Sequence, residues 1–313
     1  MRAGSPLVLA VAALASSAAS AGCGVGAGKA PSGVELTVTR DFGSVSLASW
    51  SAPRVRGAET VMSLLVRNAR VTTRYGGGFV QGIDGVAGGR TAGRPVDWFY
   101  YVNGIEAAQG AAATRVHGGE RIWWDRHDWS QTDHIPAVVG SFPEPFRHGI
   151  GGKRLPVRVE CDAVAGLACR TVVSRLRARG VPAAVAAPGS GAEPRTLRVL
   201  VAPWARIARD PVASAIAGGP AASGVYARFS AGGRTLALLD AGGRPVRTLG
   251  AGAGLIAATG RREDAPVWVV TGTDAAGVQR AAGMLSESAL RDRFAVALAP
   301  ASGKPVPLPE VSG

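Results

Sequence analysis

The chain has 313 residues, of which 47% are hydrophobic and 18% charged, so it can form folded cores and is not a disordered chain. Its 35 basic and 22 acidic residues give a formal charge of +13. Only three of the basic residues are lysine, and the arginines are scattered rather than grouped in the stripe that follows a phosphate backbone. The charge therefore predicts a basic surface facing an anionic envelope and argues against a nucleic-acid partner.

The N-terminus has the pattern of an export signal. Arg2 supplies a positive charge, residues 7–15 an apolar run, and residues 16–22 a run of small side chains. The apolar run is shorter than the ~20 residues of a membrane-spanning helix. We therefore predict a signal peptide at residues 1–22.

The signal ends in Ser-Ala-Gly-Cys, which resembles a bacterial lipobox with Ser20 where leucine is usual. This resemblance implies a lipid on Cys23, followed by a Gly-, Ala- and Ser-rich tether over residues 23–33. We expect the protein at the extracytoplasmic face of the cell membrane. Ordinary cleavage and secretion is the alternative.

Residues 34–129 are rich in aromatic side chains and are predicted to form a small sheet with one helix. Alternation over residues 34–39 predicts a strand, and apolar spacing over residues 60–70 predicts a helix. Residues 98–105 form an aromatic strand that runs into Asn103 and Gly104, the pair that best tolerates a type I′ turn.

Three segments of this half resemble the transcobalamin C-terminal-like domain family. They are Tyr-Gly-Gly-Gly-Phe-Val at 75–80, Asp-Trp-Phe-Tyr-Tyr-Val-Asn-Gly at 97–104 and Gly-Gly-Glu-Arg-Ile-Trp-Trp at 118–124. The resemblance implies an α+β, β-grasp domain over residues 34–129. In transcobalamin and intrinsic factor the related domain is the smaller half of a clamp around cobalamin. Bacterial relatives look like accessories to energy-coupling factor transporters or like adhesion modules. The large helical domain of the eukaryotic clamp is missing here.

The second half has a different pattern of predicted secondary structure. Residues 130–154 are rich in proline and glycine and are predicted to be an extended connector. Over residues 155–300, Val- and Leu-rich strands alternate with helices, which predicts a three-layer α/β domain with a largely parallel sheet. The expected strands are 155–160, 196–202, 235–240, 267–271 and 294–298, and the expected helices are 163–179, 211–217 and 275–290, the last capped by Thr273 or Asp274. Residues 301–313 are predicted to be a disordered tail.

Cys161 and Cys169 are the two cysteines that remain after lipidation of Cys23. An oxidising compartment permits a disulfide between them. Because Cys169 falls more than a turn into the expected helix, two separate buried thiols are an equal alternative.

Few groups of residues in the sequence indicate a catalytic or metal-binding site. The four histidines, His117, His127, His134 and His148, lie close in sequence among several aspartates, but without an established metal-ligand spacing. The sequence also lacks a Gly-x-Ser-x-Gly elbow and a phosphate loop. We therefore predict a protein that is not an enzyme and carries no metal and no cofactor.

The aromatic strands supply the candidate site. Side chains alternate along a strand, so Trp98 and Tyr100 point to one face and Phe99 and Tyr101 to the other. One helix covers one face, which leaves the second face either to a flat ligand or to the second domain. The predicted ligand-binding residues are Tyr75, Phe79, Gln81, Trp98, Tyr100, Tyr101, Asn103, Trp123 and Trp124.

These observations favour a lipid-anchored extracytoplasmic binding protein. Its expected ligand is cobalamin, another corrinoid or another flat molecule, captured for an energy-coupling factor type of vitamin transporter. The alternative is a cell-surface module that binds a protein or polymer without any small ligand. A metal-dependent hydrolase built on the His and Asp cluster is a third hypothesis.

Overall fold

The computed structural model describes Met1 and residues 28–190, 195–261 and 264–310. This part of the chain has a mixed α/β fold that is rich in strands arranged in several sheets. Cys23 and nearly all of the predicted signal lie outside the described residues. None of the helices in the described ranges has the length and hydrophobicity of a membrane span.

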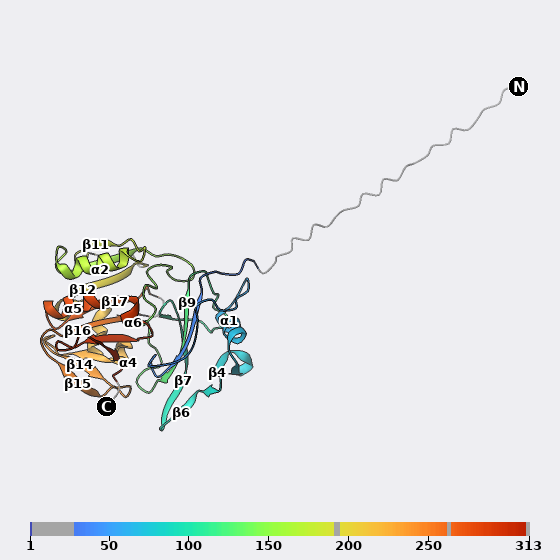
Figure 1. The fold of residues 1–313 in the computed structure, drawn as a ribbon, viewed down its shortest axis with the longest axis horizontal. Helices are drawn as coiled ribbons and strands as arrows, with labels where there is room; N and C mark the ends of the chain where they lie inside the picture. The colour runs from blue at the N-terminus through green and yellow to red at the C-terminus, as the bar shows by residue number, and fades with distance from the viewer. Residues whose placement is uncertain (2–27, 191–194, 262–263, 311–313) are drawn as a thin grey trace.

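The first half is built on one sheet with a helix on its outer face (Figure 1). The order of the strands is β2-β1-β9-β7-β6, with β8 paired to β7, and the central β1 and β9 run parallel. A smaller sheet joins β3, β4 and β5, and a short 3₁₀ turn, η1, links β3 to β4. The elements are β1 (Glu35–Arg40), β2 (Val45–Trp50), α1 (Val61–Asn68), β3 (Val71–Arg74), η1 (Tyr75–Gly77), β4 (Phe79–Ile83), β5 (Val86–Ala87), β6 (Gly89–Thr91), β7 (Arg94–Val102), β8 (Ile105–Glu106) and β9 (Arg121–Asp128).

Helix α1 occupies the predicted position because its sequence caps it and gives it one apolar face. Thr60 accepts a hydrogen bond from the Ser63 amide at 3.2 Å, and the Ser63 hydroxyl accepts one from the Thr60 amide at 2.9 Å. Val61, Leu64 and Leu65 then lie on one side and are buried against the sheet. The predicted helix is confirmed.

The second half contains a mixed sheet in the order β11-β10-β12-β17-β16-β18-β19. The four strands β11, β10, β12 and β17 run parallel to one another, whereas β16, β18 and β19 are joined by antiparallel pairings, so the sheet is less parallel than expected. Helices α2 and α5 pack on one face, and Asp274 caps α5 by accepting from the Gly277 amide at 2.9 Å. The elements are β10 (Val157–Cys161), α2 (Leu167–Arg177), β11 (Ala184–Ala186), β12 (Leu197–Pro203), β16 (Gly254–Thr259), β17 (Val267–Gly272), α5 (Ala275–Met284), α6 (Glu287–Leu290), β18 (Ala295–Leu298) and β19 (Pro305–Leu308).

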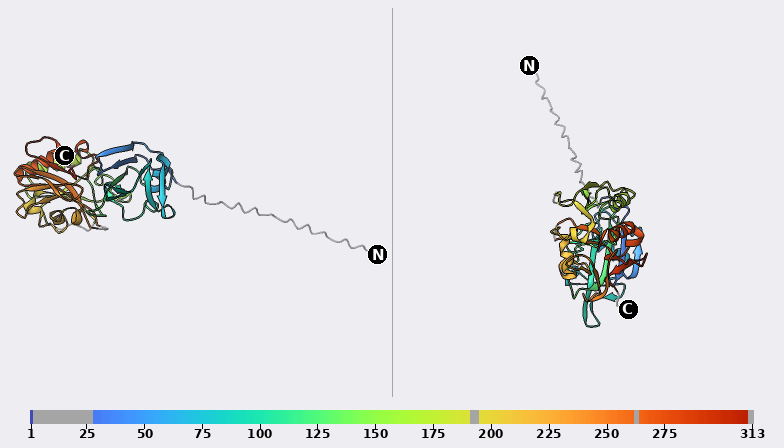
Figure 2. Two further views of the ribbon diagram at one scale, coloured as in Figure 1. Left: turned by 90° about the horizontal axis from the view of Figure 1, so that it is seen from below. Right: turned by 90° about the vertical axis from the view of Figure 1, so that its left-hand side faces the viewer.

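The opposite face of this sheet is covered by short elements and by the first half of the chain (Figure 2). The predicted strand at 235–240 lies here, in a separate antiparallel sheet rather than in the main one. The predicted helix at 211–217 is a 3₁₀ helix. These elements are α3 (Trp204–Ile207), η2 (Ala213–Gly218), α4 (Pro220–Ser223), β13 (Ala227–Phe229), β14 (Leu236–Leu239) and β15 (Pro245–Leu249).

Two predicted irregular segments are structured. Residues 301–313 were expected to be a disordered tail, but Pro305–Leu308 pairs with β18 as an edge strand; residues 311–313 lie outside the described residues. Its prolines fit that place, since one side of an edge strand needs no backbone donor.

The predicted connector at 130–154 is buried over residues 135–146. Ile135 and Val138 join the core shared by the two halves, whereas Val139, Phe142 and Phe146 join the core under α2 and α5. The proline and glycine residues indicated irregular backbone, but the apolar residues between them place it inside the protein.

Candidate functional site

The inner face of the first sheet is covered by the second half. Tyr101 and Trp123 are almost fully buried there, and both rings meet Phe294 edge to face, at centroid distances of 5.6 and 5.2 Å. Phe42 meets the same ring at 5.2 Å. Of the two alternatives for this face, a flat ligand or the second domain, the structure shows the second, because residues of the second half fill the position.

The outer face is covered by the core of the first half. Trp98 and Trp124 are buried with the apolar side of α1. Tyr100 is partly exposed, stacks on Trp124 at 4.9 Å and reaches Thr114 Oγ1 with its hydroxyl at 2.8 Å. The predicted alternation of side chains is present, but packing residues occupy both faces.

Tyr75, Phe79 and Gln81 form a separate group on the small sheet. Tyr75 is 85% exposed, and Phe79 and Gln81 are partly buried. The Tyr75 and Phe79 rings meet edge to face at 6.2 Å. The structure thus does not bring these residues together with the buried aromatic residues at the boundary between the halves.

A cavity of about 530 Å³ opens where the two halves meet, and we call it the junction cavity. Its apolar wall includes Val102, Ile105 and Ile150, together with Pro136 and Pro266. Polar groups complete the lining, and they are Glu106, Gln109, Thr114, Arg115, Glu120, His134, Arg261 and Asp264. Sequence reasoning missed this site because its walls come from four separated segments.

The turn between β7 and β8 positions one wall of the junction cavity. Asn103 and Gly104 have φ values of 53° and 75°, as a type I′ turn requires, so the predicted hairpin is confirmed. The Asn103 amide donates to the Gly149 carbonyl at 2.9 Å, and its oxygen accepts from the Arg121 amide at 3.0 Å. Asn103 thus acts as a buried link that fixes the loop carrying Ile150, rather than as a ligand contact.

Gly104 allows this turn to dock closely. A Cβ at this position would lie 2.7 Å from the Val138 carbonyl oxygen, and the Val138 amide donates to the Gly104 carbonyl at 2.8 Å. The Asn103-Gly104 pair, which predicts the turn, therefore also positions the wall of the junction cavity next to the turn.

Two carboxylates of the cavity are held by backbone amides and histidines. Glu106 accepts from the Ile135 amide at 2.8 Å and lies 2.6 Å from His134 Nδ1. Glu120 accepts from the His117 amide at 2.8 Å and lies 3.1 Å from His117 Nδ1. Burial raises the pKa of Glu120 above its ordinary value, although its contacts with His117 oppose the shift.

The four histidines do not converge on one point. His148 contacts Glu144 at 2.7 Å, and His127 contacts the buried Asp125 at 2.9 Å. Asp125 also accepts from the amides of Phe42 and Gly43 at 3.1 and 2.8 Å. Across residues 28–190, 195–261 and 264–310, no group of three His, Cys, Asp or Glu side chains is placed to hold a metal ion.

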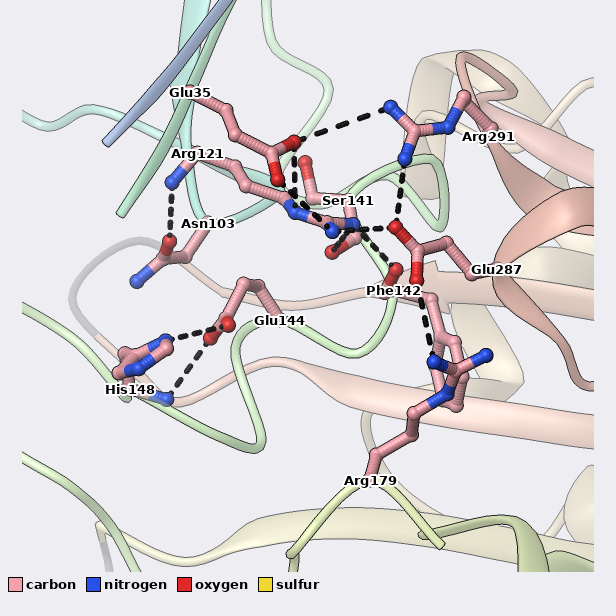
Figure 3. Close-up of polar contacts among 10 residues, drawn as sticks. All are labelled: Glu35, Asn103, Arg121, Ser141, Phe142, Glu144, His148, Arg179, Glu287 and Arg291. Carbon is pink, nitrogen blue, oxygen red and sulfur yellow. Dashed lines mark hydrogen bonds and ion pairs between the residues drawn. The ribbon is translucent and has the colours of Figure 1, made fainter. Parts of the chain in front are cut away.

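A cluster of ion pairs, shown in Figure 3, joins the two halves. Arg121 on β9 reaches Glu287 on α6 at 2.5 Å and Glu35 on β1 at 3.3 Å. Arg291 and Arg179 approach the same Glu287 at 2.6 and 3.5 Å. Burial alone would raise the pKa of Glu287, but the hydrogen bond from Arg121 and the nearby positive charges prevail and hold it below its ordinary value.

Cys161 and Cys169 are joined by a disulfide, with their Cα atoms 5.9 Å apart. A helix that began near residue 163, as the sequence predicts, would carry Cys169 away from Cys161. It begins instead at Leu167, so Cys169 lies in its first turn and turns back toward the end of β10. The bridge closes the loop at 162–168.

Residues 58–128 match a domain of unknown function (DUF4430). The match lies inside the first half and runs from the approach to α1 to the end of β9. No curated protein and no solved structure matches the chain.

Proposed function

We propose that this protein is an extracytoplasmic binding protein, anchored through Cys23, whose small-molecule site is the junction cavity. The observation that carries the proposal is a cavity of about 530 Å³ lined by both halves. Ligand sites commonly have volumes of ~300–1,000 Å³ and often lie between domains. The mixed lining suits a ligand with an apolar body and a few polar groups.

The charges at the cavity favour a ligand that carries acidic or amide groups. Arg115 and Arg261 are exposed at the cavity, where an anionic group would find donors without first becoming buried. A whole corrinoid is larger than the cavity, so it would enter by one edge or side chain. We retain cobalamin as the first ligand to test, for delivery to a vitamin transporter.

Two other features support parts of this proposal. The parallel pairing of the first and last strands, β1 and β9, with α1 across the sheet supports a β-grasp domain of the transcobalamin C-terminal type over residues 34–129. The Cys161–Cys169 disulfide supports an oxidising, extracytoplasmic location.

The test is calorimetric titration of residues 24–313 with cyanocobalamin. We expect saturable binding at micromolar concentration, abolished by Ala107→Phe, which places a ring in the cavity wall. Ala52→Phe, at an exposed position outside the lining, is the matched control. Absence of binding up to ~1 mM, where the free energy of binding is only ~4 kcal/mol, would reject the corrinoid. Equal loss in both variants would reject the cavity as the site.

The exposed Tyr75 favours a second candidate function, binding of a surface protein or polymer by the glycine-rich turn. Tyr75 has a φ of 53° and stands beside three glycines, so the backbone presents its ring outward. Tyr75→Ala should then reduce retention on isolated cell envelopes while leaving cobalamin binding unchanged.

A further inference from the structure

We propose that α2 and the disulfide-closed loop before it form a docking face for an anionic membrane surface. We call this surface the α2 face and define it by two apolar residues, Val164 and Leu167, and three arginines, Arg170, Arg175 and Arg177. The proposal rests on the anchored location proposed above, but it uses none of the cavity residues.

The outer side of α2 is basic along its whole length. Its buried side consists of Cys169, Val172, Val173 and Leu176. The 3.6-residue period places Leu167 opposite this buried side, with Arg170 and Arg175 on the two flanks of the outer side, and all three are exposed. Arg177 lies at the border between the buried and outer sides and is also exposed.

Few acidic groups balance these charges. Between Cys161 and Ser190 the chain contains four arginines and a single acidic residue, Asp162, which lies 3.5 Å from Arg206. The fourth arginine, Arg179, pairs with Glu287 and is not included in the α2 face. The Arg170 guanidinium donates to the Ala165 carbonyl, and Arg175 donates to the Gly283 carbonyl at 3.4 Å. Among the described residues, no carboxylate forms an ion pair with Arg170, Arg175 or Arg177.

The loop before α2 adds an apolar tip. Val164 in this loop is 50% exposed, and Leu167, the first residue of α2, is 58% exposed; both lie between the two bridged cysteines. Exposed aliphatic residues beside arginines are the pattern of a surface that lies in the headgroup region of a membrane. Because the disulfide holds the loop, little conformational freedom remains to be lost on docking.

The position of α2 fits an anchored protein. The described chain enters the first half along the upper edge of the molecule in Figure 1 and in the right-hand view of Figure 2, and α2 lies along the same edge at the other end of the molecule. From a lipid on Cys23, the ten residues to Gly33 span at most ~35 Å. The tether would therefore hold the α2 face near the membrane and raise its effective concentration there.

The test is flotation of residues 24–313, without lipid, on vesicles of phosphatidylglycerol and phosphatidylcholine. We expect binding to these vesicles, little binding to pure phosphatidylcholine, and weaker binding as the salt concentration rises. The triple variant Arg170→Gln, Arg175→Gln, Arg177→Gln should bind about 100-fold more weakly, at about five-fold for each arginine removed. The double variant Val164→Ser, Leu167→Ser should weaken binding with less change in its salt dependence.

The control removes the same charge elsewhere, by Arg54→Gln, Arg90→Gln and Arg234→Gln, at three exposed positions outside α2. It should stay within about three-fold of the original affinity. Equal losses in the two triple variants would show general attraction by net charge and overturn the α2 face. Full vesicle binding by the α2 variant would overturn it as well, as would absence of binding by the unaltered chain. Cobalamin titration of the same variants reports separately on the junction cavity.

Discussion

The ring of Phe294 packs between the two halves of the protein, and its removal tests whether the two halves share one core. Phe294 is 3% exposed and meets four rings edge to face, those of Phe42, Tyr101, Trp123 and His127, at centroid distances of 5.2 to 5.6 Å. Truncation of a buried phenylalanine to alanine costs ~3–5 kcal/mol, the sum of lost transfer energy and the cavity left behind. Edge-to-face contacts favour the native packing beyond simple burial, so we expect the loss of unfolding free energy for Phe294→Ala to lie in the upper part of that range, at about 4–5 kcal/mol.

The assay is urea unfolding followed by tryptophan fluorescence and by far-ultraviolet circular dichroism. Because both halves contribute to one core, the unaltered chain should unfold in a single transition, and Phe294→Ala should lower its midpoint without changing the slope. Tyr75→Ala, at an exposed aromatic residue, should change the free energy by no more than ~0.5 kcal/mol. Two separate transitions in the unaltered chain, or a cost below ~1.5 kcal/mol for Phe294→Ala, would refute the shared core.

Two further predictions concern polar and covalent links. Glu287 has a pKa below its ordinary value of 4.5, so its stabilising contribution is complete above that pH and is lost as the pH falls through the lowered pKa. Glu287→Gln should therefore cost about 1–2 kcal/mol near neutral pH and progressively less below about pH 4.5, measured as the difference in urea midpoint across a pH series; a constant difference would contradict the assignment. The disulfide closes a short loop, for which chain entropy predicts a contribution of ~2–3 kcal/mol. The double variant Cys161→Ser, Cys169→Ser should show that loss in urea unfolding, and thiol titration of the denatured, unreduced residues 24–313 should find no free thiol.

Local signals in the sequence predicted several features correctly. The type I′ turn at Asn103 and Gly104 was predictable because its positive φ values depend on those two residue types alone. Helix α1 was predictable because Thr60 and the apolar spacing act within one segment. The disulfide remained undecided, because the result depended on a four-residue shift in where α2 begins.

Features that depend on distant contacts were not predictable in this way. Alternation in the strand from Trp98 to Tyr101 was correct, but the residue that covers the inner face, Phe294, follows nearly two hundred positions later. The junction cavity combines Ile105, Ile150 and Pro266 from three regions that carry no common motif. Proline and glycine in residues 135–146 indicated a connector, since they report on backbone shape and not on burial.

The burial of residues 135–146 limits how this protein can be divided. A fragment that ends at residue 129 would lose the cover that Val138 and Phe294 provide, and would expose Tyr101 and Trp123 to water. Such a fragment would be prone to self-association, because a large exposed aromatic surface binds other apolar surfaces. We therefore expect that the segment matching the domain of unknown function does not fold independently of the second half in this chain. Gene fusions or truncations that keep the two halves and residues 135–146 together should remain soluble, whereas those that cut between them should aggregate.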